Sequence, residues 1–365
     1  MAAGRVLARP VVADRDYPPL ARSVRDGFAV RSSDSGPRAI IGEVRAGATF
    51  SGSVGPGQCV EIMTGAPIPD GADAVVMVEH TKTDNAVMLT DRISQPGEFV
   101  NPQGAEARAG DTLLAPGVRL LFPHIALLAT CGYTMVSVYC RPRVAILSTG
   151  DEVVPIETPP AANQVRNSNA WALAAQVGQA GGLPTILPVA PDEPEATRAL
   201  ILDGLQYDLL LLSGGVSAGK YDYVETVLAG LDARFVFDRV LIQPGQPLVF
   251  GIAGGRPFFG LPGNPASTMV CFQVFARAAV QLLGGETEAS LAMPLMRLTA
   301  PFSHKPGLTR FLPARTSPDG LEVTHIPWQG SSDVAAIARA NAFLVADPDR
   351  PHYGAGDPIP VILYA

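Results

Sequence analysis

Between residues 142 and 286, short apolar runs alternate with longer amphipathic segments. The apolar runs have the length and composition of strands buried on both faces of a parallel sheet, and they lie at 144–147, 185–189 and 209–212. The amphipathic segments have helical spacing and lie at 168–177, 195–205 and 223–231. This alternation predicts a three-layer α/β domain with a mostly parallel sheet.

The same pattern continues with three more predicted strands at 236–242, 248–250 and 257–261, followed by a long apolar helix at 266–283. Residues 284–293 are a predicted boundary, because short strands and Pro and Gly turns follow from 295 to 365. Residues 31 to about 100 have the same turn-dense texture. We therefore expect β-rich parts on both sides of the α/β domain.

Composition and charge narrow the class of protein. The chain has 365 residues, of which 47% are hydrophobic and 17% charged, which favours a folded protein of several domains. Its net charge of −7 argues against broad nucleic-acid binding. There is no signal-like start and no run of 18 apolar residues, so we expect a cytoplasmic protein without a membrane span. The four cysteines and five histidines are scattered and predict neither a zinc site nor a redox motif.

One glycine-rich loop, LSGGVSAGKYDY at 212–223, follows the predicted strand at 209–212. Glycines let a backbone approach a ligand closely, while hydroxyls and a carboxylate supply polar contacts. The residues that carry these features are Ser213, Gly214, Gly215, Ser217, Gly219 and Asp222. They indicate a surface for an anionic, metal-associated ligand, although a plain strand-to-helix turn also explains the glycines.

Carboxylates follow the other predicted strands. Asp151 and Glu152 come after the first strand, and Asp192 after the second. The carboxyl ends of parallel strands meet at one edge of a sheet, so these groups and Asp222 should converge there. Clustered carboxylates repel unless a divalent cation such as Mg²⁺ lies between them. Asp192 also has a simpler interpretation as the cap of the next helix.

A fourth loop, GLPGNPAST at 260–268, opens the long helix, with Asn264 as the candidate cap and Pro265 in the first turn. Free amides at such a helix start form a natural seat for an anion. Ordinary helix-start chemistry is the alternative, but two prolines around Gly263 and Asn264 make the turn stiffer than capping requires.

Seven segments, in order, resemble one family, the molybdopterin molybdenumtransferases of the MoeA type, related to the E domain of gephyrin. They are SVRDGFAVRSSD at 23–34, EIMTGAPIPDGADAVVMVE at 61–79, PRVAILSTGDE at 142–152, RNSN at 166–169, LSGGVSAGKYDY at 212–223, QPGQPLVFG at 243–251 and GLPGNP at 260–265. The resemblance covers nearly the whole chain.

The resemblance implies four structural parts. An elongated N-terminal part comprises residues 1–30 and 100–140, with a β domain inserted at 31–99. A molybdopterin-binding α/β domain spans 141–286, and a C-terminal β-barrel spans 287–365. The resemblance also implies a homodimer in which N-terminal segments of one subunit face the α/β domain of the other, and contact with other molybdenum cofactor biosynthesis proteins.

The implied reaction takes adenylylated molybdopterin and molybdate, places molybdenum on the dithiolene sulfurs and releases AMP, with Mg²⁺ as cofactor. The matching catalytic positions are Asp26, Thr64, Glu106, Glu152, Asp192 and Asp222, the last three as metal ligands. The matching pterin- and phosphate-binding positions are Thr149, Gly150, Asp151, Ser168, Ser213, Gly214, Gly215, Val216, Ser217, Gly219, Arg239, Gln243, Pro262, Gly263, Asn264 and Pro265.

The chain departs from the family at Gln243 and Gln246, where many members carry lysine. Glutamine keeps a donor but loses a full charge, which weakens binding of an oxyanion. Arg239, Arg310 and Arg315 are candidates to compensate. Two alternatives stay open: a paralogue with adenylyltransferase-like activity, and a non-catalytic molybdopterin-binding scaffold.

Overall fold

A computed structural model describes residues 2–215 and 223–364. The predicted site residues Val216, Ser217, Gly219 and Asp222 lie outside the described residues. The chain divides into two compact units, unit 1 (Met1–Ala8, Gly117–Arg119 and Val138–Ala365) and unit 2 (Arg9–Pro116 and Leu120–Ser137).

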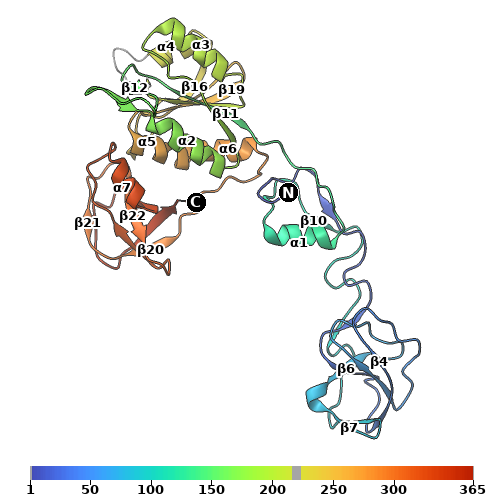
Figure 1. The fold of residues 1–365 in the computed structure, drawn as a ribbon. Coiled ribbons are helices and arrows are strands. Elements are labelled where there is room, and N and C mark those ends of the chain that lie inside the picture. The colour runs from blue at the N-terminus through green and yellow to red at the C-terminus, as the bar shows by residue number, and fades with distance from the viewer. Residues whose placement is uncertain (1, 216–222, 365) are drawn as a thin grey trace. The chain divides into compact units, whose positions relative to one another are not determined.

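A six-stranded sheet forms the centre of unit 1 (Figure 1). Its strands, in spatial order, are β14 (Leu183–Ile186), β11 (Arg143–Ser148), β15 (Leu209–Ser213), β19 (Arg256–Leu261), β18 (Val249–Ala253) and β16 (Arg234–Phe237). The first four strands are parallel, and β18 and β16 run antiparallel to their neighbours. The sheet is therefore mixed, with the expected parallel strands together on one side.

Helices cover both faces of this sheet, which confirms the three-layer prediction (Figure 1). One face packs against α2 (Ser168–Gln179), α5 (Pro265–Cys271), the π-helical segment η2 (Phe272–Ala276) and α6 (Arg277–Leu283). The other packs against α3 (Pro194–Gly204) and α4 (Tyr223–Ala229). Strand β15 is buried along its whole length between the two layers, as its unbroken leucine run predicts.

Two predicted elements differ from the structure. The strand expected at 236–242 is divided, because β16 ends at Phe237 and a separate strand, β17 (Ile242–Gln243), pairs with the C-terminal domain. The helix expected at 266–283 is continuous but contains the π-helical segment. The helical stretch Pro265–Leu283 is long and apolar enough to cross a membrane. Half of its most apolar window is buried inside the protein, as in the core helix of a soluble protein, so its length and composition are weak evidence for a membrane span.

The C-terminal part of unit 1 forms the predicted β-barrel. Five strands close on themselves: β22 (Thr309–Thr316), β23 (Glu322–His325), β20 (Leu295–Leu298), β26 (Pro358–Leu363) and β24 (Ala342–Ala346). A short pair, β21 (Phe302–Ser303) and β25 (His352–Tyr353), and the helix α7 (Val334–Arg339) lie outside this closed ring. Phe311, Ile337 and Phe343 share one hydrophobic core with α5 and α2, so the barrel is packed onto the α/β domain.

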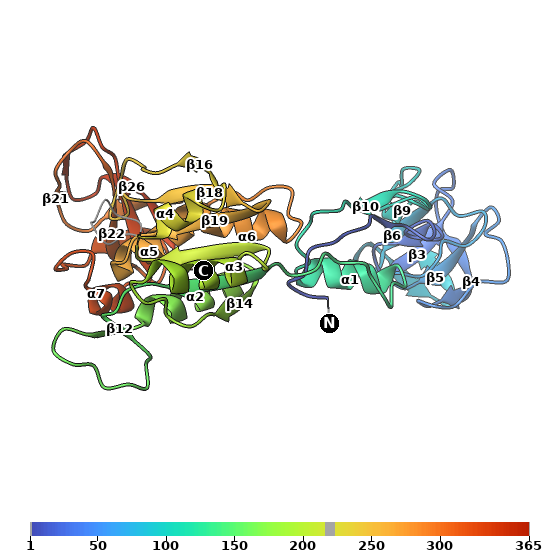
Figure 2. The same cartoon turned by 90° about the horizontal axis from the view of Figure 1, so that it is seen from above.

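Two further features of unit 1 lie at its periphery. Strands β12 (Val153–Val154) and β13 (Val165–Arg166) pair in parallel, and the segment between them projects as an exposed loop (Figure 2). Arg119 forms an ion pair with Glu286 and donates hydrogen bonds to the carbonyl oxygens of Gly4 and Ala180. The N-terminal residues are thereby tied to the α/β domain.

Unit 2 contains a six-stranded sheet. In spatial order its strands are β6 (Ala74–Met77), β3 (Gly27–Val30), β5 (Gln58–Ile62), β4 (Arg38–Val44), β8 (Val87–Leu89) and β7 (Lys82–Asp84). A 3₁₀ turn, η1 (Val78–His80), follows β6. The rest of the unit has the helix α1 (Phe122–Thr130) and two antiparallel pairs, β1 (Val11–Val12) with β10 (Thr112–Leu114) and β2 (Arg22–Ser23) with β9 (Val100–Asn101).

Candidate active site

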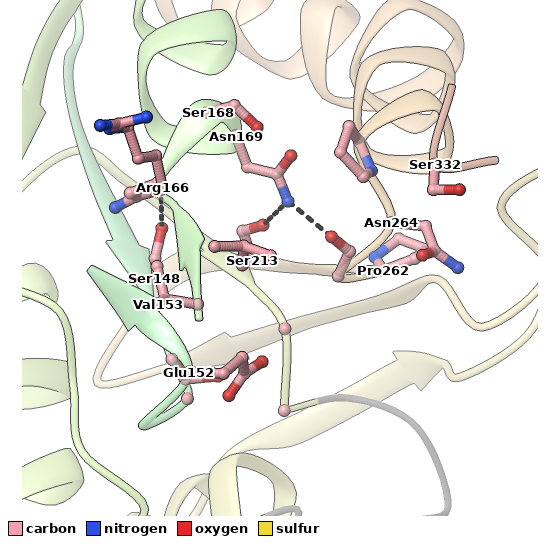
Figure 3. Close-up of a pocket in the computed structure, with 18 of the residues that line it drawn as sticks. Ser148, Glu152, Val153, Arg166, Ser168, Asn169, Ser213, Pro262, Asn264 and Ser332 are labelled. Carbon is pink, nitrogen blue, oxygen red and sulfur yellow. Dashed lines mark hydrogen bonds between the residues drawn. The ribbon is translucent and has the colours of Figure 1, made fainter. Parts of the chain in front are cut away.

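A cavity of about 760 Å³ lies at the carboxyl ends of β11, β15 and β19 (Figure 3). This is the edge at which open parallel sheets place their ligands. The loops after β11, β14, β15 and β19 line it, together with β12 and β13, the start of α2, the turn before β18 and the segment at the start of α7. The lining residues are Ser148, Thr149, Gly150, Glu152, Val153, Val165, Arg166, Asn167, Ser168, Asn169, Asp192, Ser213, Gly214, Gly215, Pro247, Pro262, Gly263, Asn264, Pro265, Ser332 and Val334.

The turn after β11 depends on Gly150. This residue has φ = +123°, and an added Cβ would overlap the carboxylate of Glu152. The neighbouring Thr149 is in close contact with the glycine loop, because a Cβ on Gly214 would lie 3.1 Å from the Thr149 carbonyl oxygen. Glycines at both turns therefore let the two loops and the Glu152 carboxylate crowd together.

Asn167 connects the end of β11 to the start of α2. Its Oδ1 accepts hydrogen bonds from the Ala170 amide at 3.2 Å and from the Ser148 hydroxyl at 3.0 Å. It is thus the N-cap of α2 and also holds the last residue of β11. This double contact sets the position of Ser168 and Asn169, which follow it in the helix.

Asn169 connects the other two strand ends. Its Nδ2 donates to the Ser213 hydroxyl oxygen at 2.9 Å and to the Gly263 carbonyl oxygen at 2.7 Å (Figure 3). Ser213 ends β15, and Gly263 belongs to the loop between β19 and α5. One carboxamide therefore holds three loops of the cavity together.

The start of α5 is less open to an anion than the sequence suggests. Pro265 has no amide hydrogen, and the Ala266 amide already donates to the Ser331 carbonyl oxygen of the barrel at 2.9 Å. The expectation of a free amide at the helix start is therefore wrong at Ala266, and Pro265 has none to offer. A barrel loop occupies the helix start, while Asn264 precedes it without a side-chain capping bond.

Two carboxylates, those of Glu152 and Asp192, line the cavity, and both side chains are exposed. Asp151 does not line it; its Oδ1 instead accepts a hydrogen bond from the Asp192 amide at 3.1 Å. In the described parts of the chain no group of three or more His, Cys, Asp or Glu is arranged to hold a metal ion. Mg²⁺ usually takes only one or two protein carboxylates together with substrate phosphates and water, so this pair fits that cation.

Family models match most of the chain in three consecutive parts. The MoeA N-terminal region (domain I and II) matches residues 1–132, the probable molybdopterin binding domain matches 145–281, and the MoeA C-terminal region (domain IV) matches 296–364. A molybdopterin molybdenumtransferase of Bacillus subtilis is 35% identical, over 98% of this chain and 87% of that protein. The chain belongs to the molybdopterin molybdenumtransferase family.

Other members support this membership. A molybdopterin molybdenumtransferase of a Nostoc species is 39% identical over 77% of this chain and 67% of its own length. The crystal structure of the molybdopterin biosynthesis MoeA protein from Pyrococcus horikoshii superposes with a TM-score of 0.83 at 25% identity, covering 100% of this chain and 92% of that one. The resemblance seen in the sequence is therefore confirmed.

Positive charge is scarce in the cavity of this MoeA-family chain. Arg166 is the only basic residue lining it among those that the structure describes. Arg239 and Gln243, predicted to bind the ligand, do not line it. Arg310 and Arg315 donate to the carbonyl oxygens of Lys305 and Arg339, so both guanidinium groups already have partners.

Three predicted catalytic residues of the MoeA pattern lie in unit 2. The Asp26 Oδ1 accepts hydrogen bonds from the Thr64 amide at 2.6 Å and the Thr64 hydroxyl at 2.7 Å. These bonds lower the pKa of Asp26 below its usual value of 3.8, with the backbone bond as the larger cause. Glu106 forms an ion pair with Arg22 and accepts a hydrogen bond from the side-chain Nδ2 of Asn101. The roles of all three stay predictions.

Sequence reasoning did not assign a role to several polar residues that line the cavity, among them Arg166, Asn169 and Ser332. Arg166 and Asn169 belong to the RNSN segment, whose position at the start of a predicted helix was a usable signal. Ser332 comes from the barrel, and no local pattern connects it with the sheet edge. Only the packing of the barrel onto α5 brings it there.

Proposed function

We propose that this enzyme of molybdenum cofactor biosynthesis inserts molybdenum from molybdate into adenylylated molybdopterin and releases AMP. The observation that carries the proposal is the cavity, in which two carboxylates, hydroxyls and glycine-rich turns meet within the matched molybdopterin-binding domain. Relatives at 31–39% identity bear the name molybdopterin molybdenumtransferase.

Glu152 and Asp192 would hold Mg²⁺ together with phosphate oxygens of the substrate, and Asp222, outside the described residues, is the third proposed ligand. When bound, Mg²⁺ would offset negative charge on the phosphate oxygens. The turns at Gly150, Gly214 and Gly215 let a ligand approach the backbone closely.

The remaining predicted positions complete the proposed binding surface. Hydroxyls of Thr149, Ser168 and Ser213 are placed to bind polar groups of the ligand, since all three residues line the cavity. The loop from Pro262 to Pro265 forms the opposite wall. In the proposed reaction water adds to a phosphorus of the phosphoanhydride, the bridging bond breaks, and AMP leaves while the pterin keeps its own phosphate.

We infer further that the protein acts in the cytoplasm as a homodimer, in which segments around Asp26 and Thr64 of one subunit complete the cavity of the other. The proposed domain limits are those that the family resemblance implies: 1–30 with 100–140, 31–99, 141–286 and 287–365. Mixing an Asp26→Ala variant with a Glu152→Ala variant tests the shared site. Activity regained in the mixture supports it, and none regained contradicts it.

The test of the reaction uses purified protein, adenylylated molybdopterin and Mg²⁺, with and without molybdate. AMP release that depends on molybdate, with molybdenum retained on the pterin, is the expected result. In a second incubation, with molybdopterin, ATP and Mg²⁺, adenylylation of the pterin would indicate the adenylyltransferase-like paralogue. Tight pterin binding with neither product would indicate a scaffold.

A further inference from the structure

The carboxamide of Asn169 has an orientation that its surroundings determine. The Gly263 carbonyl oxygen carries no hydrogen and only accepts, so the atom facing it at 2.7 Å is the amide nitrogen. The same nitrogen faces the Ser213 hydroxyl oxygen at 2.9 Å. Asn169 therefore donates to both groups (Figure 3).

This orientation decides what Ser213 offers to a ligand. A serine hydroxyl has one hydrogen, and because its oxygen here accepts from Asn169, that hydrogen points elsewhere. Ser213 is only 3% exposed and lines the cavity. Within residues 2–215 and 223–364 its hydroxyl hydrogen meets no acceptor. Among the described residues this buried donor has no acceptor, and because Ser213 lines the cavity, a ligand oxygen there would supply one.

The other end of the carboxamide supports a specific role for Asn169. Its Oδ1 is buried and has no donor among the described residues. An unpaired buried carbonyl is unfavourable, and a side chain that served only to fill space would avoid it. The position of the NH₂ group is therefore the feature that distinguishes Asn169 from an apolar residue.

We propose that Asn169 is a positioning residue that acts through Ser213, by holding its hydroxyl as a donor toward an oxygen of the substrate. The oxygen belongs to a phosphate or to the pterin ring, since both are acceptors of this kind. This inference rests on the proposed function, because it takes adenylylated molybdopterin as the ligand.

The experiment measures the dissociation constant of adenylylated molybdopterin, without molybdate, by fluorescence titration. It uses the wild type, Ser213→Ala, Asn169→Asp and the double variant. Aspartate keeps the shape of asparagine, but its carboxylate accepts the Ser213 hydrogen and turns it away from the ligand. Asn163→Asp adds the same charge on the exposed loop between β12 and β13 and is the matched control.

Each single variant is expected to weaken binding roughly tenfold, the effect of one lost hydrogen bond. In the Ser213→Ala background, Asn169→Asp should weaken binding by a clearly smaller factor than in the wild type, because only the effects of the added charge and of the lost bond to Gly263 are left. The control should bind like the wild type. If the aspartate variant fails to fold, Asn169→Ala replaces it in the same cycle.

Equal losses from Asn169→Asp in both backgrounds would show that it acts only by supporting the Gly263 loop and would overturn the inference. Unchanged affinity in Ser213→Ala would overturn it as well. A wild type that binds no adenylylated molybdopterin would instead overturn the proposed function, and the inference with it. Competition by inorganic phosphate identifies the ligand oxygen. If Ser213→Ala and Asn169→Asp weaken the binding of phosphate as much as that of the pterin, the oxygen belongs to a phosphate. If phosphate binds these variants as it binds the wild type, the oxygen belongs to the pterin ring.

Discussion

Glu152 lies directly over the turn at Gly150, and this closeness keeps its carboxylate at the sheet edge. Asp192 reaches the same cavity from the loop before α3. The two residues are 40 positions apart in sequence, yet both follow parallel strands, so the sequence alone predicts that they meet. Asp151 was predicted beside them, but its side chain accepts a bond from the backbone of Asp192 and does not line the cavity.

Glu152→Gln should lower the rate of Mg²⁺-dependent AMP release roughly 100-fold, since a neutral amide is a much poorer ligand for Mg²⁺ than a carboxylate. Pterin binding without Mg²⁺ should change little. Glu157→Gln, in the exposed loop after β12, removes the same charge outside the cavity and is the control. An equal loss in both variants would contradict a specific role for Glu152.

Thr64→Val should raise the pKa of Asp26 but leave it below 3.8, because the hydroxyl bond is lost while the larger backbone bond stays. The stabilisation by these bonds is present above pH 3.8 and is lost as the pH falls through the lowered pKa. A carbon-13 NMR titration of the Asp26 carboxyl measures the shift. Thr83→Val, at an exposed position of β7, should leave that titration unchanged.

At the scale of elements, the pairing of β3 with its neighbours explains why residue 27 is a glycine. Asp26 followed by Gly27 has the composition of a turn, but Gly27 starts β3 between β5 and β6. A Cβ there would overlap the carbonyl oxygen of Val76 on β6. The close approach of two backbones therefore requires glycine at this position.

Gly27→Ala should destabilise the sheet of unit 2 by about 3 kcal/mol, since the Val76 backbone must move to admit the methyl group. Gly47→Ala has open space around its Cβ but a φ of +82°, and it should be destabilising by only about 1 kcal/mol. Urea titrations in which unfolding is monitored by amide hydrogen exchange in β3 and β6 give the loss of stability in each variant. The reverse order of the two effects would contradict the backbone-clash explanation.

The alternation of short apolar runs and helical segments was sufficient to predict the order of elements in the α/β domain. It was insufficient at residues 236–242, where β17 leaves the sheet and pairs with β22. The pairing partner begins at Thr309, so no local pattern reveals it. The prediction of a free amide at the start of α5 was wrong for the same reason. The Ala266 amide donates to the carbonyl oxygen of Ser331, which is distant in sequence and belongs to the barrel.

At the scale of the whole molecule, the division into two units predicts two unfolding transitions. Phe343 of the barrel shares a hydrophobic core with α5. Phe343→Ala should therefore lower the free energy of unfolding of unit 1, including the α/β domain, by about 3–5 kcal/mol. Val60 is buried in the core of unit 2, and Val60→Ala should lower only the unfolding temperature of unit 2. Differential scanning calorimetry distinguishes them, with each variant as the control for the other. A single transition shifted by both would contradict the division.

The loop that begins after Trp328 has two residues next to the cavity. The Ser331 carbonyl oxygen accepts a hydrogen bond from the Ala266 amide at the start of α5, and Ser332 lies in the cavity wall. Trp328 itself packs against the shared core. The protein therefore carries its own fluorophore close in sequence to a residue of the cavity wall, Ser332. With the exposed Trp171 replaced by Phe, emission from Trp328 should report occupancy in real time, without any label.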